Sequence, residues 1–71
     1  MINDIKSIIS EFVEVDENEI RSESNLRSDI GLSSLDLISV ATEIESKFGV
    51  TISERKVLSL KTVDDLIKCI V

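Results

Sequence analysis

The fold of this chain is decided by residues 29–38, which read Asp29-Ile30-Gly31-Leu32-Ser33-Ser34-Leu35-Asp36-Leu37-Ile38. A turn that contains glycine runs here directly into a predicted helix. The hydroxyl of Ser33 can cap this helix by accepting a hydrogen bond from a backbone N–H two or three residues on. Asp36 then occupies the third helical position, where its carboxylate can accept from the capping residue and lies near the positive end of the helix dipole.

Ser34 has no part in this capping and points outward from the first helical turn. The free N–H groups of such a turn favour an anion, for example a phosphate. Ser34 is therefore a candidate attachment point for a phosphate-linked group. The alternative is that Ser33 and Ser34 simply begin a capped helix in a small bundle, and this stretch alone does not separate the two interpretations.

The run D-I-G-L-S-S-L-D-L resembles the phosphopantetheine attachment motif of acyl carrier proteins, usually D-x-G-x-D-S-L-D. The resemblance covers almost the whole chain, in the order of its elements as well as in the motif. It implies that Ser34 carries 4′-phosphopantetheine, taken from coenzyme A, through a phosphodiester, and that the terminal thiol holds an acyl group as a thioester. The sequence departs from the family at Ser33, where Asp is most common, so one acidic contact for the modifying phosphopantetheinyl transferase is missing.

The composition sets limits on the fold. The 71 residues are enough for one small domain, residues 1–71, that buries only about 60% of its unfolded surface. A single cysteine excludes an intrachain disulfide, and the absence of histidine argues against structural zinc, so we expect no metal site. Helical packing must therefore stabilise the domain alone. The absence of proline and the presence of only two glycines suit helices joined by few sharp turns.

The net charge of −6, with a pI near 4.4, bears on location and partners. Nucleic acid is a poor partner, because binding phosphates requires clustered Lys and Arg. Basic patches on other proteins are better partners. No apolar run approaches the roughly 20 residues of a membrane span, and the first residues show no signal-peptide pattern. We therefore expect a cytoplasmic protein, and a monomer.

Apolar periodicity predicts an all-α fold, a small four-helix bundle with three main helices, one short helix and a long first loop. The predicted helices are about Asn3–Val15, with Asn3 as the cap; about Ser34–Phe48, followed by Gly49; 54–58, capped by Ser53; and a last helix capped by Thr62, with Asp65 at its third position. This order matches that of the carrier proteins.

Each predicted element has its own buried residues. They are Ile5, Ile8, Ile9, Phe12 and Val13 in the first helix; Ile20, Leu26, Ile30 and Leu32 in the loop 16–32; Leu37, Val40, Ala41, Ile44 and Phe48 in the second helix; Val57 and Leu58 in the third; and Val63, Leu66, Ile67 and Ile70 in the last. Arg55, Lys56 and Lys61 form a basic cluster that we interpret as a solvated face balancing nearby carboxylates.

The outer face of the second predicted helix is a candidate docking surface. Leu35 lies there in water beside the candidate attachment serine, between acidic residues. Such an exposed apolar spot rimmed by carboxylates suits a basic, partly apolar partner, although single exposed leucines are also common. The residues expected to take part are Leu35, Asp36, Ile38, Thr42, Glu43 and Glu45. Ser39 and Ser46 stand where the family often has Glu, so this face is less acidic than usual.

The resemblance implies a carrier rather than an enzyme. Without histidine the chain cannot build a Ser–His or Cys–His nucleophile pair, and no acid–base dyad is recognisable. The leading interpretation is an acyl carrier for fatty-acid, polyketide or related lipid biosynthesis, served by acyl-transferring, ligase or synthase enzymes with basic docking patches. Two alternatives remain open. One is a discrete aminoacyl or peptidyl carrier, which the less acidic face of the second predicted helix mildly favours. The other is an unmodified helical interaction module.

The resemblance also implies that the core can open to shelter an aliphatic chain. The residues that we expect to line such a space are Ile38, Val40, Ile44, Leu60 and Ile67.

Overall fold

The computed structural model describes residues 1–71 and contains only helices and connecting segments. In chain order these are α1 (Ile2–Ser10), the single 3₁₀ turn η1 (Glu17–Glu19), α2 (Ser34–Phe48), α3 (Glu54–Ser59) and α4 (Val63–Lys68). The only strand-like pairing is an isolated bridge between Asn25 and Thr62. The predicted all-α bundle with a long first loop is therefore confirmed. None of its helices is long and apolar enough to cross a membrane.

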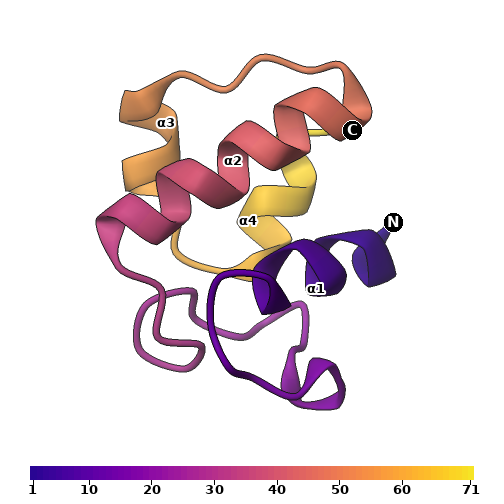
Figure 1. Cartoon of the computed structure of the whole chain (residues 1–71). Helices are drawn as coiled ribbons and strands as arrows, with labels where there is room; N and C mark the ends of the chain where they lie inside the picture. The colour runs from indigo at the N-terminus through magenta and orange to yellow at the C-terminus, as the bar shows by residue number, and fades with distance from the viewer.

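The longest helix, α2, contacts two of the other helices. It packs against both α1 and α3, and α1 also packs against α4 and η1. Figure 1 shows α2 crossing the molecule, with α3 beside the end at which α2 begins and with the long connection between α1 and α2 looping along the opposite side. This arrangement leaves the first turn of α2 at the edge of the bundle, next to that loop.

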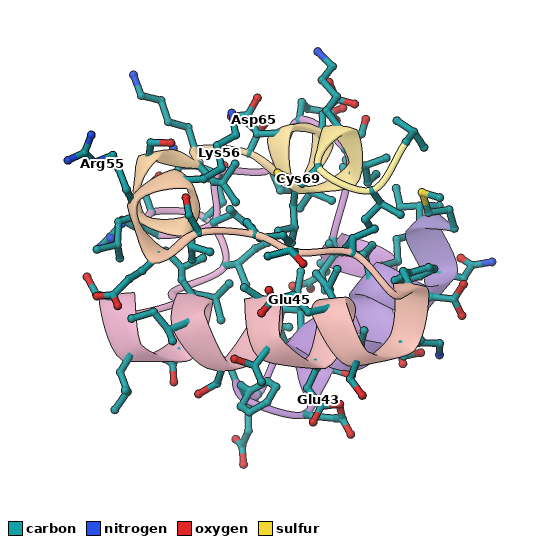
Figure 2. The ribbon with its side chains drawn as sticks, turned by 90° about the horizontal axis from the view of Figure 1, so that it is seen from above. Glu43, Glu45, Arg55, Lys56, Asp65 and Cys69 are labelled. Carbon is teal, nitrogen blue, oxygen red and sulfur yellow. The ribbon has the colours of Figure 1, made fainter.

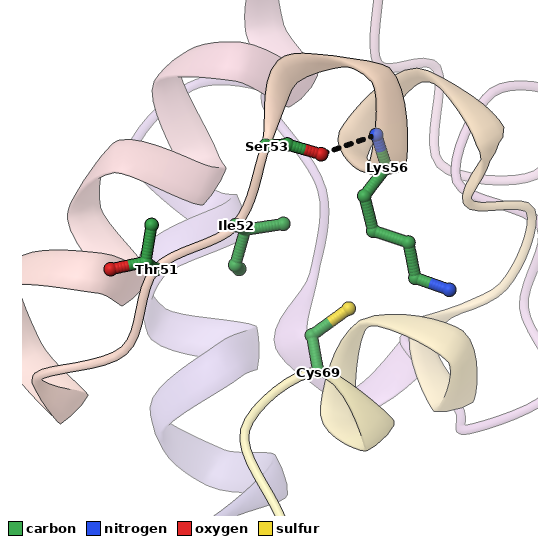
Figure 3. A pocket seen from close by; sticks show the side chains of 5 residues that line it. All are labelled: Thr51, Ile52, Ser53, Lys56 and Cys69. Atoms are coloured by element: carbon green, nitrogen blue, oxygen red, sulfur yellow. Dashed lines mark hydrogen bonds between the residues drawn. The ribbon is translucent and has the colours of Figure 1, made fainter.

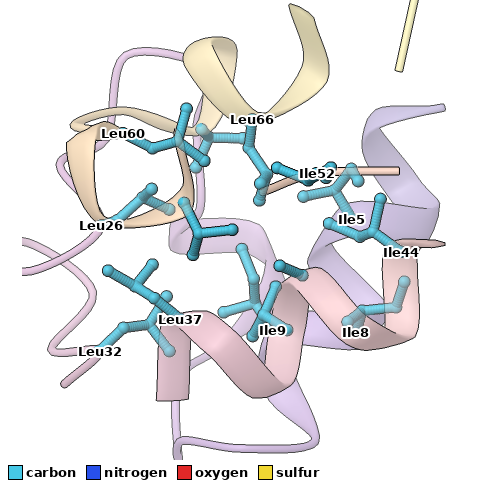
Figure 4. Packing of buried hydrophobic residues seen from close by; sticks show 14 of the residues in the cluster. Ile5, Ile8, Ile9, Leu26, Leu32, Leu37, Ile44, Ile52, Leu60 and Leu66 are labelled. Carbon is cyan, nitrogen blue, oxygen red and sulfur yellow. The ribbon is translucent and has the colours of Figure 1, made fainter. Parts of the chain in front are cut away.

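A single hydrophobic core holds these elements together. Fifteen residues, all apolar, are buried in it, and no polar or charged residue is. Figure 4 shows their side chains meeting from all four helices and from the connections. Since the burial of apolar surface is the main favourable term in folding, this cluster stabilises the bundle. Its members are Ile5, Ile8, Ile9, Ile20, Leu26, Leu32, Leu37, Val40, Ala41, Ile44, Ile52, Val57, Leu60, Val63 and Leu66.

The structure confirms both ends of α2. Ser33 Oγ accepts from the N–H of Asp36 at 3.1 Å, and Asp36 Oδ2 accepts from the N–H of Ser33 at 3.0 Å, which completes the capping box. Gly49 ends the helix in the left-handed conformation with φ of 67°, which glycine adopts without a steric penalty. Phe48, predicted to be buried, is only partly buried but packs against the core.

The predicted bounds of the first helix are wrong at both ends. Asn3 lies inside α1 rather than at its cap, and Met1 occupies the cap position without a side-chain hydrogen bond. The helix ends at Ser10, and the N–H of Phe12 bonds to the carbonyl of Ile9, three residues back, at 3.0 Å, which tightens the last turn. Phe12 and Val13 still pack against the core from that turn, so the apolar pattern continues beyond the helix.

The prediction that Leu58 faces inward is also wrong, since 41% of it is exposed. Val57 is buried as predicted, and the residue after it is rotated by about 100° around the helix axis, toward solvent. Leu60 returns to the core three residues after Val57. Thr62 and Asp65 form the predicted capping box at the start of α4.

The long loop is anchored as predicted. Ile20, Leu26 and Leu32 are almost fully buried, and Ile30 packs partly buried against the core. The loop is also bonded to the segment before α4, where the N–H of Leu26 donates to the carbonyl of Lys61 at 2.8 Å. These contacts give the backbone next to the start of α2 a defined position.

Candidate functional site

Ser34 is the first residue of α2, and its side chain is exposed. The capping box uses the hydroxyl of Ser33 and the N–H groups of Ser33 and Asp36, so it leaves the Ser34 hydroxyl free of the cap. The N–H groups of Ser34 and Leu35 make no hydrogen bond within the protein. Two free backbone donors therefore lie beside an exposed hydroxyl at the positive end of a fifteen-residue helix.

The chain enters this site through a turn at Gly31. Its φ of 91° lies in a region that residues with a Cβ rarely adopt. The next residue, Leu32, is buried, and its N–H donates to the carbonyl of Leu26 at 2.9 Å. The turn thus fastens the chain to the core one residue before the helix cap, which holds Ser33 and Ser34 in place.

Arg27 is part of the site, and the sequence did not indicate it. Its Nη2 donates a hydrogen bond to Ser34 Oγ at 3.0 Å. Arg27 lies in a loop without periodicity, seven residues before Ser34, and no pattern in the sequence places its side chain there. The only available signal was a cation that directly follows a predicted anchor, Leu26, in an otherwise acidic chain.

These groups fit the phosphate of a phosphopantetheine attached at Ser34. A phosphodiester carries negative charge on oxygen atoms that accept hydrogen bonds. The free N–H groups of Ser34 and Leu35 and the guanidinium of Arg27 are all donors, and the guanidinium adds a positive charge. The residues around Ser34 therefore suit an attached phosphate.

The structure separates the six predicted docking residues into two groups. Leu35, with 72% of its surface exposed, faces solvent together with Thr42 and Glu43. Asp36 belongs to the capping box, and Ile38 packs partly buried against the core. Glu45 is turned the other way, since its Oε2 accepts from the N–H of Ile52 at 2.9 Å. Figure 2 shows this difference, with Glu43 pointing outward and Glu45 toward the segment that leads to α3.

The basic cluster on and after α3 is solvated. Arg55, Lys56 and Lys61 are exposed, and none forms an ion pair with a carboxylate. The ion pairs of the chain join Lys47 to Asp4 at 3.3 Å and Lys68 to Asp64 at 3.1 Å. The expected balancing of this cluster by nearby carboxylates therefore does not involve direct contacts.

One surface pocket, of about 410 Å³, lies between the segment before α3 and the end of α4. It is lined by Thr51, Ile52, Ser53, Lys56 and Cys69, and Figure 3 shows the last two side chains directed into it. None of these residues belongs to the predicted lining of an acyl-chain space. Val40 and Ile44 from that prediction are fully buried in the packed core, so the opening of the core stays a prediction about a loaded protein.

Comparisons with known proteins find relatives over nearly the whole chain. Residues 3–70 match the family model described as a phosphopantetheine attachment site. Curated relatives include the acyl carrier protein of Thermotoga maritima, which is 39% identical over 66 residues, covering 93% of this chain and 82% of that protein. The acyl carrier protein of Coprothermobacter proteolyticus is 37% identical over 70 residues, covering 99% and 85%.

A solved structure is also similar. It is that of a protein from Mycobacterium tuberculosis proposed to be an acyl carrier protein. The two structures superpose with a TM-score of 0.81 at 28% sequence identity, over 96% of this chain and 90% of the other. The likeness therefore extends over the whole bundle rather than one helix.

Proposed function

This chain belongs to the acyl carrier protein family, whose phosphopantetheine-binding domain carries the group covalently, and we propose that Ser34 is its attachment residue. The observation that carries the proposal is the exposed Ser34 hydroxyl at the first turn of α2, beside two free N–H groups and Arg27. Ser33 has a hydroxyl too, but that oxygen accepts a hydrogen bond from Asp36 and caps the helix. We propose residues 1–71 as one carrier domain.

The attachment reaction uses coenzyme A and a phosphopantetheinyl transferase. Ser34 Oγ forms a bond to the phosphorus next to the pantetheine half of coenzyme A. The bond from this phosphorus to the oxygen that bridges the diphosphate breaks, adenosine 3′,5′-bisphosphate leaves, and a base of the transferase takes up the serine proton. Bound at Ser34, the group supplies a terminal thiol that holds an acyl chain as a thioester.

The chain itself then serves to present the cargo. Ser34 lies at the exposed end of α2, and Leu35, Asp36, Ile38, Thr42, Glu43 and Glu45 follow it on the same helix. We propose that the outward part of this helix, led by Leu35 and Glu43, docks onto basic, partly apolar patches of acyl-transferring, ligase or synthase enzymes. The net charge of −6 favours such partners by electrostatic attraction. We propose that the chain acts as a monomer and catalyses no reaction itself.

The proposed cargo is an acyl chain of fatty-acid, polyketide or related lipid biosynthesis. The names of the two curated relatives support an acyl cargo. A specific observation keeps an aminoacyl or peptidyl cargo as the second candidate. On the outer side of α2, this chain has Ser39 and Ser46 at positions where the family often has an acidic residue. An enzyme that docks onto fatty-acid carriers would therefore meet fewer negative charges on this chain.

Loading tests of the phosphopantetheine-bearing protein distinguish these cargoes. In one reaction it receives malonyl-coenzyme A and a malonyl transferase; in the other it receives ATP, a mixture of amino acids and amino-acid-activating ligases. The intact mass of the product is then measured. We expect a malonyl adduct in the first reaction alone. An adduct only in the second would contradict the acyl assignment and favour the aminoacyl carrier, whereas a cellular function retained by Ser34→Ala would favour an unmodified interaction module.

A further inference from the structure

We propose that Arg27 binds the phosphate of the group attached to Ser34 and so positions the base of the carrier arm. This inference rests on the proposed attachment at Ser34. It assigns a role to a loop residue that lies outside the attachment motif and outside the outer face of α2. Arg27 acts here as a positioning residue, because it holds the attached phosphate and leaves the thiol end of the arm free.

The position of the guanidinium carries the inference. Arg27 Nη2 donates to Ser34 Oγ at 3.0 Å. Attachment replaces the hydroxyl proton of Ser34 by phosphorus, so the charged phosphate oxygens lie two bonds from the oxygen atom that Arg27 already contacts. The guanidinium has five N–H donors in a rigid, planar fork, and such forks bind phosphates with two hydrogen bonds. Four of these donors have no partner in the protein.

The charge of Arg27 is also available. Although the chain has 14 acidic residues, no carboxylate forms an ion pair with Arg27. Of the three arginines, Arg21, Arg27 and Arg55, only Arg27 forms a side-chain hydrogen bond. An attached phosphate adds negative charge to a chain that already carries −6. A cation within hydrogen-bond distance offsets the resulting repulsion where the new charge lies.

The loop holds the backbone of Arg27 ready for this contact. Asn25 Oδ1 accepts from the N–H groups of Arg27 and Ser28, each at 2.9 Å. Asp29 Oδ2 accepts from the N–H of Asn25 at 2.7 Å and closes the turn. Leu26, the neighbour of Arg27, is fully buried. Since the backbone is already fixed, binding a phosphate orders only the Arg27 side chain.

NMR of the wild-type protein in its unmodified and phosphopantetheine-bearing forms tests this inference. Intact mass first establishes that the arm is attached. The side-chain N–H signals of the three arginines are then compared between the two forms. We expect the Arg27 guanidinium signals to shift, and the ³¹P signal of the arm to move when salt is raised to about 1 M, where the Debye length is about 3 Å. Arg21 and Arg55 are internal controls, so their signals should not change.

Variants supply the matched comparison. Arg27→Gln removes the charge of an exposed side chain and leaves the backbone hydrogen bonds of the turn in place. We expect its ³¹P signal to lose the salt dependence and Arg27→Lys to retain part of it, because lysine keeps the charge without the fork. Arg55→Gln, an equal loss of charge on α3, should behave as the wild type.

The outcomes separate this inference from the proposed function. A wild-type protein that gains no arm with several transferases contradicts both. A protein that gains the arm on Ser34 while the Arg27 signals stay unchanged, or whose Arg27→Gln variant keeps the wild-type ³¹P behaviour, overturns the role of Arg27 alone. The wild-type comparison decides the matter even if a variant is not modified.

Discussion

At the scale of single residues, the adjacent hydroxyls of Ser33 and Ser34 lie in different environments. Ser33 Oγ accepts from the backbone of Asp36, whereas Ser34 Oγ accepts from the guanidinium of Arg27. The family most often has Asp where this chain has Ser33, and both residue types cap helices well. The substitution therefore preserves the helix start, and its consequence is confined to the charge that a transferase meets there.

Asp65 is the residue for which the structure predicts a dependence of stability on pH. The N–H groups of Thr62 and Lys61 both donate to Asp65 Oδ2 at 3.1 Å. These bonds, that from Thr62 first, hold the pKa of Asp65 below its ordinary value of 3.8. Because the folded state favours the ionised form, the stabilisation is complete above the unfolded pKa and is lost as pH falls through the folded one.

We therefore expect Asp65→Asn to lower the free energy of unfolding at neutral pH, and this deficit to shrink as pH falls below about 3.8. The amide oxygen can still accept a hydrogen bond, so the variant removes mainly the charge. Urea unfolding of both proteins across pH 2–7 measures the difference, with the pH range chosen to span the titration of carboxylates. A deficit that stays constant down to the lowest pH would contradict the assignment.

At the level of the elements, the position of the loop between α1 and α2 depends on a few single buried side chains. Leu26 is fully buried, lies within the hydrogen-bonded turn of residues 25–29, and donates its N–H to the carbonyl of Lys61. Removing its side chain leaves a cavity in a core that has only fifteen buried residues. A domain of this size has a total free energy of unfolding of roughly 4–11 kcal/mol, so the loss of one buried side chain removes a large share of it.

Leu26→Ala should lower the free energy of unfolding by about 2–5 kcal/mol. Leu58→Ala is the matched control, because the same atoms are removed from a residue that is 41% exposed. It should cost no more than about 0.5–1 kcal/mol. Urea unfolding of both variants makes the comparison, and equal losses would mean that the loop contributes no specific anchoring.

The ends of the helices show why one helix boundary could be predicted from the sequence and another could not. The bounds of α2 were predicted correctly because Ser33, Asp36 and Gly49 mark its ends by local chemistry. The end of α1 was missed, because Phe12 and Val13 keep their apolar contacts with the core beyond the last helical residue, Ser10. Apolar periodicity indicates which residues are buried. It does not mark the end of a helix when the residues of the following turn are buried too.

The same limit applies to the candidate site. Ser34 stands inside a motif, so it could be proposed from sequence alone. Arg27 reaches Ser34 because Asn25 and Asp29 close a turn and Leu26 fills the core, and these are contacts of the folded chain. Leu58 was misplaced because six residues are too few for a periodic pattern to settle which side of α3 is buried.

At the scale of the whole molecule, the net charge and the exposed side of α2 together predict how partners bind. The Glu43 side chain is exposed on the outer part of α2 and takes part in no ion pair or hydrogen bond. Charges at the rim of an interface act chiefly on the association rate and are screened by salt. A transferase with a basic patch should therefore be sensitive to this residue at low ionic strength.

Glu43→Lys should lower the kcat/KM of phosphopantetheine transfer by about two- to fivefold at low salt, equivalent to about 0.4–1 kcal/mol. The difference should vanish near 1 M salt, where the Debye length is about 3 Å. Glu19→Lys, an identical change of net charge on η1, is the control. If it slows transfer as much as Glu43→Lys does, the overall charge rather than the outer side of α2 governs the encounter.

The attachment at Ser34 is tested most directly by intact mass, followed by fragmentation of the modified peptide, after incubation with coenzyme A and a broad-specificity transferase. Wild type, Ser34→Ala and Ser33→Ala are compared. Ser33→Ala should lose about 1 kcal/mol of stability with its helix cap and still gain the arm. We expect one phosphopantetheine on wild type, located at Ser34, and none on Ser34→Ala. An arm that persists on Ser34→Ala, or a wild type that stays unmodified with several transferases, would contradict the attachment at Ser34.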